Sequence, residues 1–397
     1  MATRSFQQIA PLVRSFRVTS NNSGNFLGFL RSIPCDYLFP NLSSVAINVV
    51  PGTLGLPFDK LLPPTLREMT LIYDTVFSVC MTLRYLEQFD LRLTAFHLIS
   101  QDHYVDLVQI PERLLLNPCM TSLWLRRTRI PYTQFVDVLQ LHSLRTLDIY
   151  LPHAWASCTL PKAMLGSLTA LGIQWESCAV SGIVMQILSL THFSRQLQTL
   201  ELSMSFDCKA DCVEATLLIV GSLPQLRDVA FTFGKIIGEQ TCVITVHPCI
   251  LRPLMKGCTL TRLSLIGMII QPPHELAEMI VTYQPLLEHL QVSSLCASTA
   301  PPTSVFDWQD IQCILTVCLH LRHLSVPFQI DWDREEDVPP SAPPQCPHHL
   351  TFSMLYMTIC FGTRDCVCAF VRTLRRNVDV QPFAPDFHHE SQPEDSN

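Results

Sequence analysis

The residue types best suited to chemistry gather near the carboxyl end of the sequence. Cys346, His348 and His349 lie close in sequence to Cys366 and Cys368. A zinc site needs four thiolate or imidazole groups that converge on one point. Apolar residues around the last two cysteines indicate a helix, on which side chains two positions apart diverge. Buried thiols and ordinary loop histidines explain this segment better, and an enzyme with a thiol or zinc site at residues 346–368 is the alternative.

No other motif of catalysis or cofactor binding is present in the sequence. It contains neither a glycine-rich phosphate-binding loop nor a G-x-S-x-G nucleophile turn, and only 13 of its 397 residues are glycine. The 17 cysteines are odd in number and lie mostly in apolar runs, which favours buried free thiols in a reducing compartment. We therefore predict a protein that is not an enzyme, with no metal and no cofactor.

Composition and charge argue against two further classes of function. The balance of 27 Lys and Arg against 34 Asp and Glu gives a net charge of −7, without a long basic run to follow a nucleic-acid backbone. The first 13 residues lack the apolar core of a secretory signal. The uncharged run 177–194 includes serine, glutamine and histidine, so a helix packed inside the protein explains it better than a membrane span. We expect a cytoplasmic or nuclear protein.

The elements that must position any functional residue follow from one recurring phrase. It consists of an apolar residue, two variable residues, an apolar residue, one variable residue and a last apolar residue. Its copies begin at residues 13, 42, 66, 93, 120, 144, 168, 197, 226, 260, 287 and 321. Most intervals fall within the roughly 20 to 29 residues of a leucine-rich repeat. The two intervals of 34 residues, before 260 and before 321, indicate loop insertions.

The phrase also predicts how the repeats fold. Its alternating end forms a short strand with one buried face, and a parallel neighbour is reached through a crossover helix. Helical patterns occupy residues 133–140, 211–220, 274–283 and 308–319, and the first of them places Phe135, Val136 and Leu139 on one face. A doubly wound α/β domain would need longer apolar strands. We predict an α/β leucine-rich-repeat solenoid, a horseshoe with short parallel strands on its concave face and helices on its convex face.

Domain organisation follows from where this pattern stops. We predict a solenoid of about twelve irregular repeats over residues 1–380, interrupted by an acidic, proline-rich loop at 331–347. A helix at about 365–376 would cap the open end. Residues 381–397 contain too few apolar residues to pack, which predicts a disordered tail.

The repeat phrases resemble the irregular leucine-rich-repeat portion of fungal F-box proteins. The likeness rests on Leu141–Ile149, Leu223–Val229, Gln284–Val292 and Cys318–Val326 and extends over most of the chain. In that family an N-terminal F-box binds the Skp1 adaptor of a cullin-type ubiquitin ligase, and the repeats select the substrate. The Leu-Pro-x-Glu-Ile-like opening of an F-box is absent here. The resemblance implies a substrate-recognition subunit, with Skp1 and a cullin as partners.

The strand residues between the buried ones should line the concave face in columns. Their most prominent cluster contains tryptophan, arginine and tyrosine, the types enriched at binding hot spots. The alternative is a surface ion pair of Arg126 with Asp148, beside a Trp124 half covered by a loop. We predict a protein–protein interaction scaffold whose partner-binding residues are Trp124, Arg126, Asp148, Tyr150, Gln174, His97 and Glu201.

Overall fold

The computed structural model describes most of the chain between Phe6 and Cys360. The described residues are 6, 8–19, 28, 30–50, 56–101, 107–160, 167–192, 196–204, 210–233, 236–237, 240–241, 244–293, 306–326, 328–331, 351–352 and 357–360. The predicted loop at 331–347 lies outside them apart from its first residue, and the predicted helix at 365–376 and tail at 381–397 lie wholly outside.

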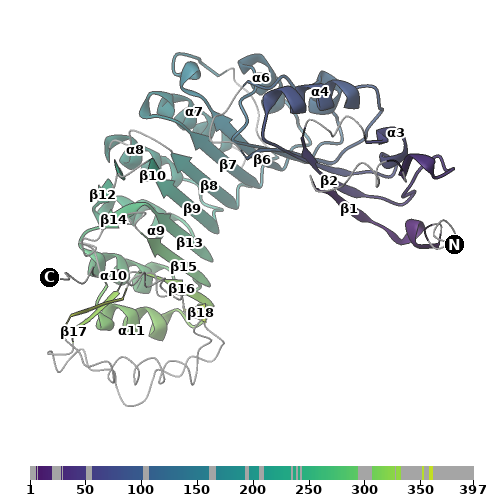
Figure 1. Cartoon of the computed structure of the whole chain (residues 1–397). Helices are drawn as coiled ribbons and strands as arrows, with labels where there is room; N and C mark the ends of the chain where they lie inside the picture. The colour runs from purple at the N-terminus through teal and green to yellow at the C-terminus, as the bar shows by residue number, and fades with distance from the viewer. Residues whose placement is uncertain are drawn as a thin grey trace, which may run out of the picture.

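One parallel sheet of thirteen strands runs the length of an arch and lines its inner side (Figure 1). Neighbours along the sheet follow one another in the chain, except where short strands intervene. The strands are β1 (Ser15–Val18), β2 (Ser44–Val49), β3 (Glu68–Tyr73), β4 (Ala95–Ser100), β5 (Ser122–Arg126), β6 (Thr146–Leu151), β7 (Ala170–Trp175), β8 (Thr199–Met204), β9 (Asp228–Phe233), β13 (Arg262–Ile266), β15 (His289–Ser293), β16 (His323–Ser325) and β18 (Thr351–Phe352).

Each of the twelve sequence phrases coincides with a strand of this sheet. Every strand from β1 to β16 in the sheet begins two residues after the first apolar residue of its phrase, as β7 does after Leu168. The three apolar residues of that phrase, Leu168, Leu171 and Ile173, are each at most 1% exposed. The predicted fold class, an open α/β solenoid with one elongated apolar interior, is therefore confirmed.

Helices connect the strands and cover the outer side of the arch (Figure 1). The α-helices are α3 (Phe58–Leu61), α4 (Val76–Leu86), α5 (Glu112–Leu115), α6 (Tyr132–Leu139), α7 (Ser181–His192), α8 (Ala210–Val220), α9 (Arg252–Gly257), α10 (Pro273–Tyr283) and α11 (Trp308–Val317). Short 3-10 turns are η1 (Ala10–Leu12), η3 (His153–Trp155), η4 (Cys178–Val180) and η5 (Pro248–Leu251). Each of the four predicted helical patterns overlaps one of these helices and differs from it by at most two residues at either end, and the uncharged run at 177–194 contains α7.

Local sequence explains where several helices begin and which face they bury. Asp307 accepts a hydrogen bond from the Asp310 backbone at 2.7 Å and closes a capping box before α11. Proline stands at the first turn of α9 and α10, where its missing N–H has no cost. In α6 the buried face contains Val138 beside Phe135 and Leu139, whereas the predicted Val136 is half-buried. Val136 lies three residues before Leu139 and Val138 three residues after Phe135, so the helical period alone does not decide between the two valines.

Small additional strands lie away from the main sheet. They are β10 (Ile236–Ile237), β11 (Gln240–Thr241), β12 (Ile244–Val246), β14 (Met268–Ile270), β17 (Phe328–Asp331) and β19 (Met357–Cys360). The 34-residue interval before 260 holds β10, β11, β12 and α9, so the predicted insertion carries structure of its own.

Buried polar groups join successive repeats. Gln284, 1% exposed, donates from Nε2 to the carbonyls of Met255 and Cys258 at 2.5 and 2.9 Å. Its Oε1 accepts from the Leu260 backbone N–H at 2.8 Å. Asn117 donates in the same way to the Leu91 carbonyl at 3.0 Å. These side chains satisfy backbone groups that the turns between helix and strand would otherwise leave unpaired in the core.

Candidate functional site

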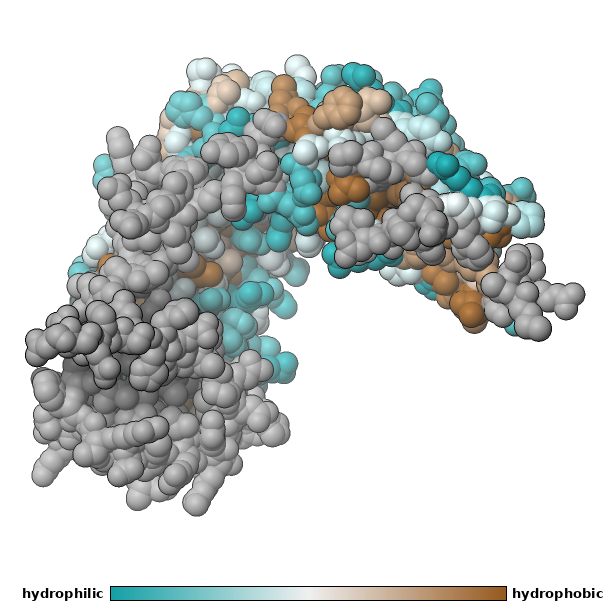
Figure 2. All heavy atoms as spheres, in the orientation of Figure 1, coloured by the Kyte–Doolittle hydropathy of each residue, from teal (hydrophilic) through white to brown (hydrophobic). Residues whose placement is uncertain are grey.

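The concave face is built from strand side chains that point away from the core, and the strand register aligns them in columns. The middle column runs through His97, Trp124, Asp148, Gly172 and Glu201 on β4 to β8. Hydrophilic residues follow the inner edge of the C-terminal half of the arch, while hydrophobic ones gather near its N-terminal end (Figure 2). Because each of these strands pairs with two neighbours, the face presents side chains and few free backbone groups.

Trp124 stands at the centre of the predicted cluster and is partly exposed. Its ring stacks on that of His97 with 4.6 Å between centroids and 20° between planes. Thr70 Oγ1 lies 3.3 Å from His97 Nδ1 and helps to orient the imidazole. Burial lowers the pKa of His97, against the opposing effect of Glu68, so the imidazole is neutral near pH 7. The Trp124 ring thus lies nearly parallel to an uncharged imidazole that stacks on it.

Arg126 lies on the other side of Trp124, two residues along β5. Its Cζ is 5.0 Å from the tryptophan ring centroid, within the range of a cation–π interaction. Its Nε donates to Asp148 Oδ2 at 2.6 Å, and NH2 lies 3.4 Å from Glu201 Oε2. The Arg126 side chain keeps 38% of its surface exposed. The ion pair of Arg126 with Asp148, which the sequence offered as the alternative to a binding role, is present, and it orients a guanidinium that solvent still reaches.

Asp148 is nearly buried at 4% exposure, and its environment is unfavourable for charge. Burial raises the pKa of Asp148, and the hydrogen bond from Arg126 only partly offsets that effect. A Cβ at Gly172 would lie 3.0 Å from Asp148 Cγ, so the glycine on the next strand makes room for the carboxylate. Asp148 therefore acts here as the fixed support of Arg126, with little surface of its own to offer a partner.

Tyr150 occupies a different place from the rest of the predicted set. It is 7% exposed, and its hydroxyl donates to Glu176 Oε1 at 2.7 Å. Glu176 also accepts hydrogen bonds from Arg129 and from the backbone N–H of His153. Burial, together with Glu176, raises the pKa of Tyr150. The structure thus places Tyr150 in a hydrogen-bonded cluster with Glu176 and Arg129, which follow the ends of β7 and β5; we call this cluster the Glu176 clamp. The sequence gave no indication that Arg129 or Glu176 would be its partners.

The remaining predicted residues, Gln174 and Glu201, are partly exposed on β7 and β8. Gln174, two residues after Gly172, pairs in register with Tyr150 and Ser203. Glu201 reaches back across the glycine position toward Arg126. The structure therefore brings His97, Trp124, Arg126, Gln174 and Glu201 to one accessible surface, which we call the Trp124 surface.

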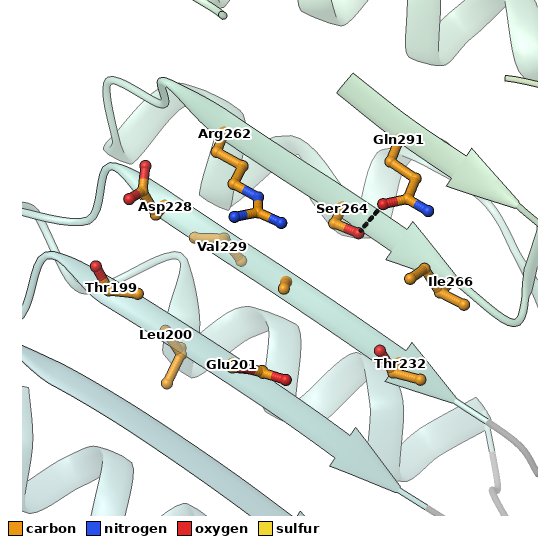
Figure 3. A pocket seen from close by; sticks show the side chains of 11 residues that line it. Thr199, Leu200, Glu201, Asp228, Val229, Thr232, Arg262, Ser264, Ile266 and Gln291 are labelled. Carbon is orange, nitrogen blue, oxygen red and sulfur yellow. Dashed lines mark hydrogen bonds between the residues drawn. The ribbon is translucent and has the colours of Figure 1, made fainter. Parts of the chain in front are cut away.

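A shallow hollow of about 200 Å³ lies on the same face toward the C-terminal end (Figure 3). It spans β8, β9, β13 and β15, and its lining includes Glu201, Ala230, Arg262, Ser264 and Gln291. Of these residues, only Glu201 belongs to the set predicted from the sequence to bind a partner. The signal was available, because Arg262 and Ser264 hold the same outward positions of their phrase as Ser122 and Trp124 hold in theirs.

Within the part of the chain that the structure describes, no three His, Cys, Asp or Glu side chains form a metal-binding group. Cys346, His348, His349, Cys366 and Cys368 lie outside the described residues. Cys258 and Cys318 are buried, and burial raises the pKa of each thiol to about 11. Three others, Cys119, Cys249 and Cys313, are exposed, contrary to the expectation of buried thiols.

Comparisons with known proteins add little to this geometry. The sequence matches no family model and no curated protein. It is similar in structure to the plant peptide hormone receptor RGFR1 in complex with RGF2, with a TM-score of 0.27 and 11% identity, over 81% of this chain and 57% of the receptor. None of the described helices is both long and apolar enough to cross a membrane.

A second solved structure is the LRR ectodomain of the receptor kinase GASSHO1/SCHENGEN3 from Arabidopsis thaliana in complex with CASPARIAN STRIP INTEGRITY FACTOR 2. The TM-score is 0.26 and the identity 12%, over 93% of this chain and 51% of that one. The chain thus spans about half the length of these two solved chains. Scores this low carry no statement about function, and the fold rests on the sheet itself.

Proposed function

We propose that this chain is a non-enzymatic protein-interaction scaffold that binds an extended segment of a partner protein across its concave face. The observation that carries the proposal is the Trp124 surface. There a partly exposed tryptophan is flanked by a stacked, neutral imidazole and by a guanidinium with fixed direction. Tryptophan and arginine are the residue types that dominate binding energy at protein interfaces.

The mode of binding follows from the sheet. Strands β2 to β9 each have two hydrogen-bonded neighbours, so a partner cannot join the sheet there as an added strand. Contact must come from side chains, whose columns run across the strands. An extended segment that crosses the strands would meet these columns in turn.

The side chains of the Trp124 surface are held in place before a partner binds, which favours binding. His97 and Arg126 hold the Trp124 ring from two sides, and Asp148 holds Arg126. Side chains already fixed before binding lose less conformational freedom when a partner arrives. The surface therefore keeps more of its contact energy as affinity.

The finer assignment, which we also propose, is a substrate receptor of a Skp1–cullin ubiquitin ligase in the cytoplasm or nucleus. Its support is the resemblance of phrases such as Leu141–Ile149 and Cys318–Val326 to the repeats of fungal F-box proteins. Affinity purification of the tagged chain with mass spectrometry tests it. Stoichiometric recovery of Skp1 and a cullin is expected, and their absence from a purification that retains other partners would refute the ligase assignment alone.

The scaffold function is tested by one pair of matched variants. Trp124→Ala removes the central aromatic ring, and Phe77→Ala removes a 75%-exposed ring from α4 on the convex side. We expect a specific partner to be lost with the first variant, by about 30-fold or more in affinity, and retained with the second. Circular dichroism and a thermal melt show that both variants are folded. Equal partner recovery from both would refute the Trp124 surface as the binding site.

A further inference from the structure

The hollow beyond the Trp124 surface contains a cation, Arg262, that forms no ion pair with any residue the structure describes. Arg262 extends from β13 over β9, while the carboxylate of Asp228, its register neighbour, points away (Figure 3). Asp228 instead accepts a hydrogen bond from Thr261 Oγ1 at 2.7 Å. Among the described residues, no carboxylate lies within ion-pair distance of Arg262. An exposed guanidinium in this position is available to a ligand.

The neighbouring groups add hydrogen-bond donors of fixed direction. Ser264 Oγ donates to Gln291 Oε1 at 3.2 Å, and Gln291 Nε2 donates to no residue that the structure describes (Figure 3). Thr232 adds a hydroxyl at the same rim, and Ala230 forms a floor with only a methyl group. The hollow therefore has an apolar base and several hydrogen-bond donors in its lining, which also includes the carboxylates of Asp228 and Glu201.

The other charges nearby do not cancel this preference. Glu201, across the hollow, lies within ion-pair distance of Arg126, at 3.4 Å. His289, the next residue after Arg262 in its column, stacks on His323 with 4.1 Å between ring centroids. Burial and the neighbouring His323 lower the pKa of His289 to about 4, so it stays neutral near pH 7. Arg262 is thus the cation that faces the hollow, and a carboxylate can accept two parallel N–H bonds from it.

We propose that the hollow binds an acidic side chain, aspartate or glutamate, of the segment that crosses the concave face, with Arg262 as its anchor and Gln291 as a second donor. This deepens the proposed function and rests on it. The face continues beyond the hollow on both sides, to β7 and to β16, so the segment can pass through. An internal acidic side chain fits that arrangement, and a chain terminus is not required.

Peptide display on the full chain tests the proposal. The probe is a phage library of random twelve-residue peptides whose carboxyl ends are fused to the coat protein, so that only side chains supply carboxylates. The library is selected on the wild-type chain, on Arg262→Glu and on Arg262→Gln. Arg84→Gln, which removes an exposed arginine from the convex helix α4, is the matched control.

We expect peptides selected on the wild type to carry aspartate or glutamate at one shared position. Their affinity should fall at least about tenfold with Arg262→Gln and stay unchanged with Arg84→Gln. Selection on Arg262→Glu should exchange the acidic residue for lysine or arginine.

Two negative results separate the two proposals. Peptides that are lost with Trp124→Ala yet show no acidic position and no response to Arg262 would overturn the acidic-side-chain site and leave the scaffold function standing. A library in which no peptide binding depends on Trp124 would overturn both.

Discussion

Close approach of two glycines on the convex side gives the sharpest test of the packing. An added Cβ at Gly257, the last residue of α9, would lie 2.5 Å from the backbone oxygen of Gly221, which follows α8. Ordinary contact begins at 3.4 Å, so the two backbones would have to separate by 0.9 Å, the difference of these distances. No flexible side chain can move aside, because the obstacle is backbone.

The expected cost of Gly257→Ala is therefore large for a single methyl group. Overpacking of this kind costs about 1–3 kcal/mol, and we expect the upper part of that range. Gly182→Ala is the matched control: it makes the same chemical change near the start of α7, where nothing lies within 4 Å of the added Cβ. There the higher helix propensity of alanine should stabilise the protein by up to about 1 kcal/mol.

Urea unfolding of the wild type and both variants, followed by circular dichroism, measures the two effects. Opposite signs are expected, with Gly257→Ala lowering the free energy of unfolding and Gly182→Ala raising it or leaving it unchanged. A Gly257→Ala variant as stable as the wild type would refute the close stacking of α8 on α9.

Three further predictions concern buried polar groups. Gln284→Ala should lower the free energy of unfolding by about 3 kcal/mol or more, measured by urea unfolding, because three buried backbone groups lose their partner. Burial raises the pKa of Asp148 in the folded state, so the wild type should lose stability as pH rises from the ordinary carboxyl range through that raised pKa. Asp148→Asn removes the titrating group, so the stability of this variant relative to the wild type should rise with pH, as unfolding curves would show. A stability difference that does not change with pH would contradict this prediction. Iodoacetamide at about pH 8 should label the exposed Cys119 and spare Cys258, whose thiol pKa is about 11, as peptide mass spectrometry would show.

The strand positions could be predicted from sequence because they depend on local alternation that repeats. Leu168, Leu171 and Ile173 fill the same places as Leu197, Leu200 and Leu202 one repeat later, and parallel pairing keeps them in step. A stack of this kind leaves each phrase little freedom to slip, since a one-residue shift would expose its apolar face. The helices were harder to predict in detail, as Val136 and Val138 illustrate.

The candidate site could be predicted only where the register persists. Trp124 pairs with Asp148 as expected, but the ladder between β5 and β6 ends there. Arg127 follows β5 with a φ of 53°, a left-handed conformation that an arginine in the sequence does not predict. The chain then carries Arg129 to Glu176 and Tyr150. Alternation alone could not show that Tyr150 would be taken up by this clamp.

The hollow was missed for another reason. The hollow exists because the Ala230 side chain is small and leaves space. Arg262 forms no ion pair with a described residue, although Asp228 is its register neighbour. Both facts arise from side-chain geometry, since Thr261 holds Asp228 in another direction. Aligning the repeats shows which residues face outward, but it does not show which charged side chains form ion pairs.

Site-specific photo-cross-linking tests most directly whether the concave face is the binding surface. A photoreactive phenylalanine derivative replaces Gln174, which lies on that face, and in a second sample it replaces Phe77 on the convex helix α4. The derivative at position 174 should cross-link to the partner, and the derivative at position 77 should not. Cross-links that form from position 77 alone would contradict the account and place the partner on the convex side.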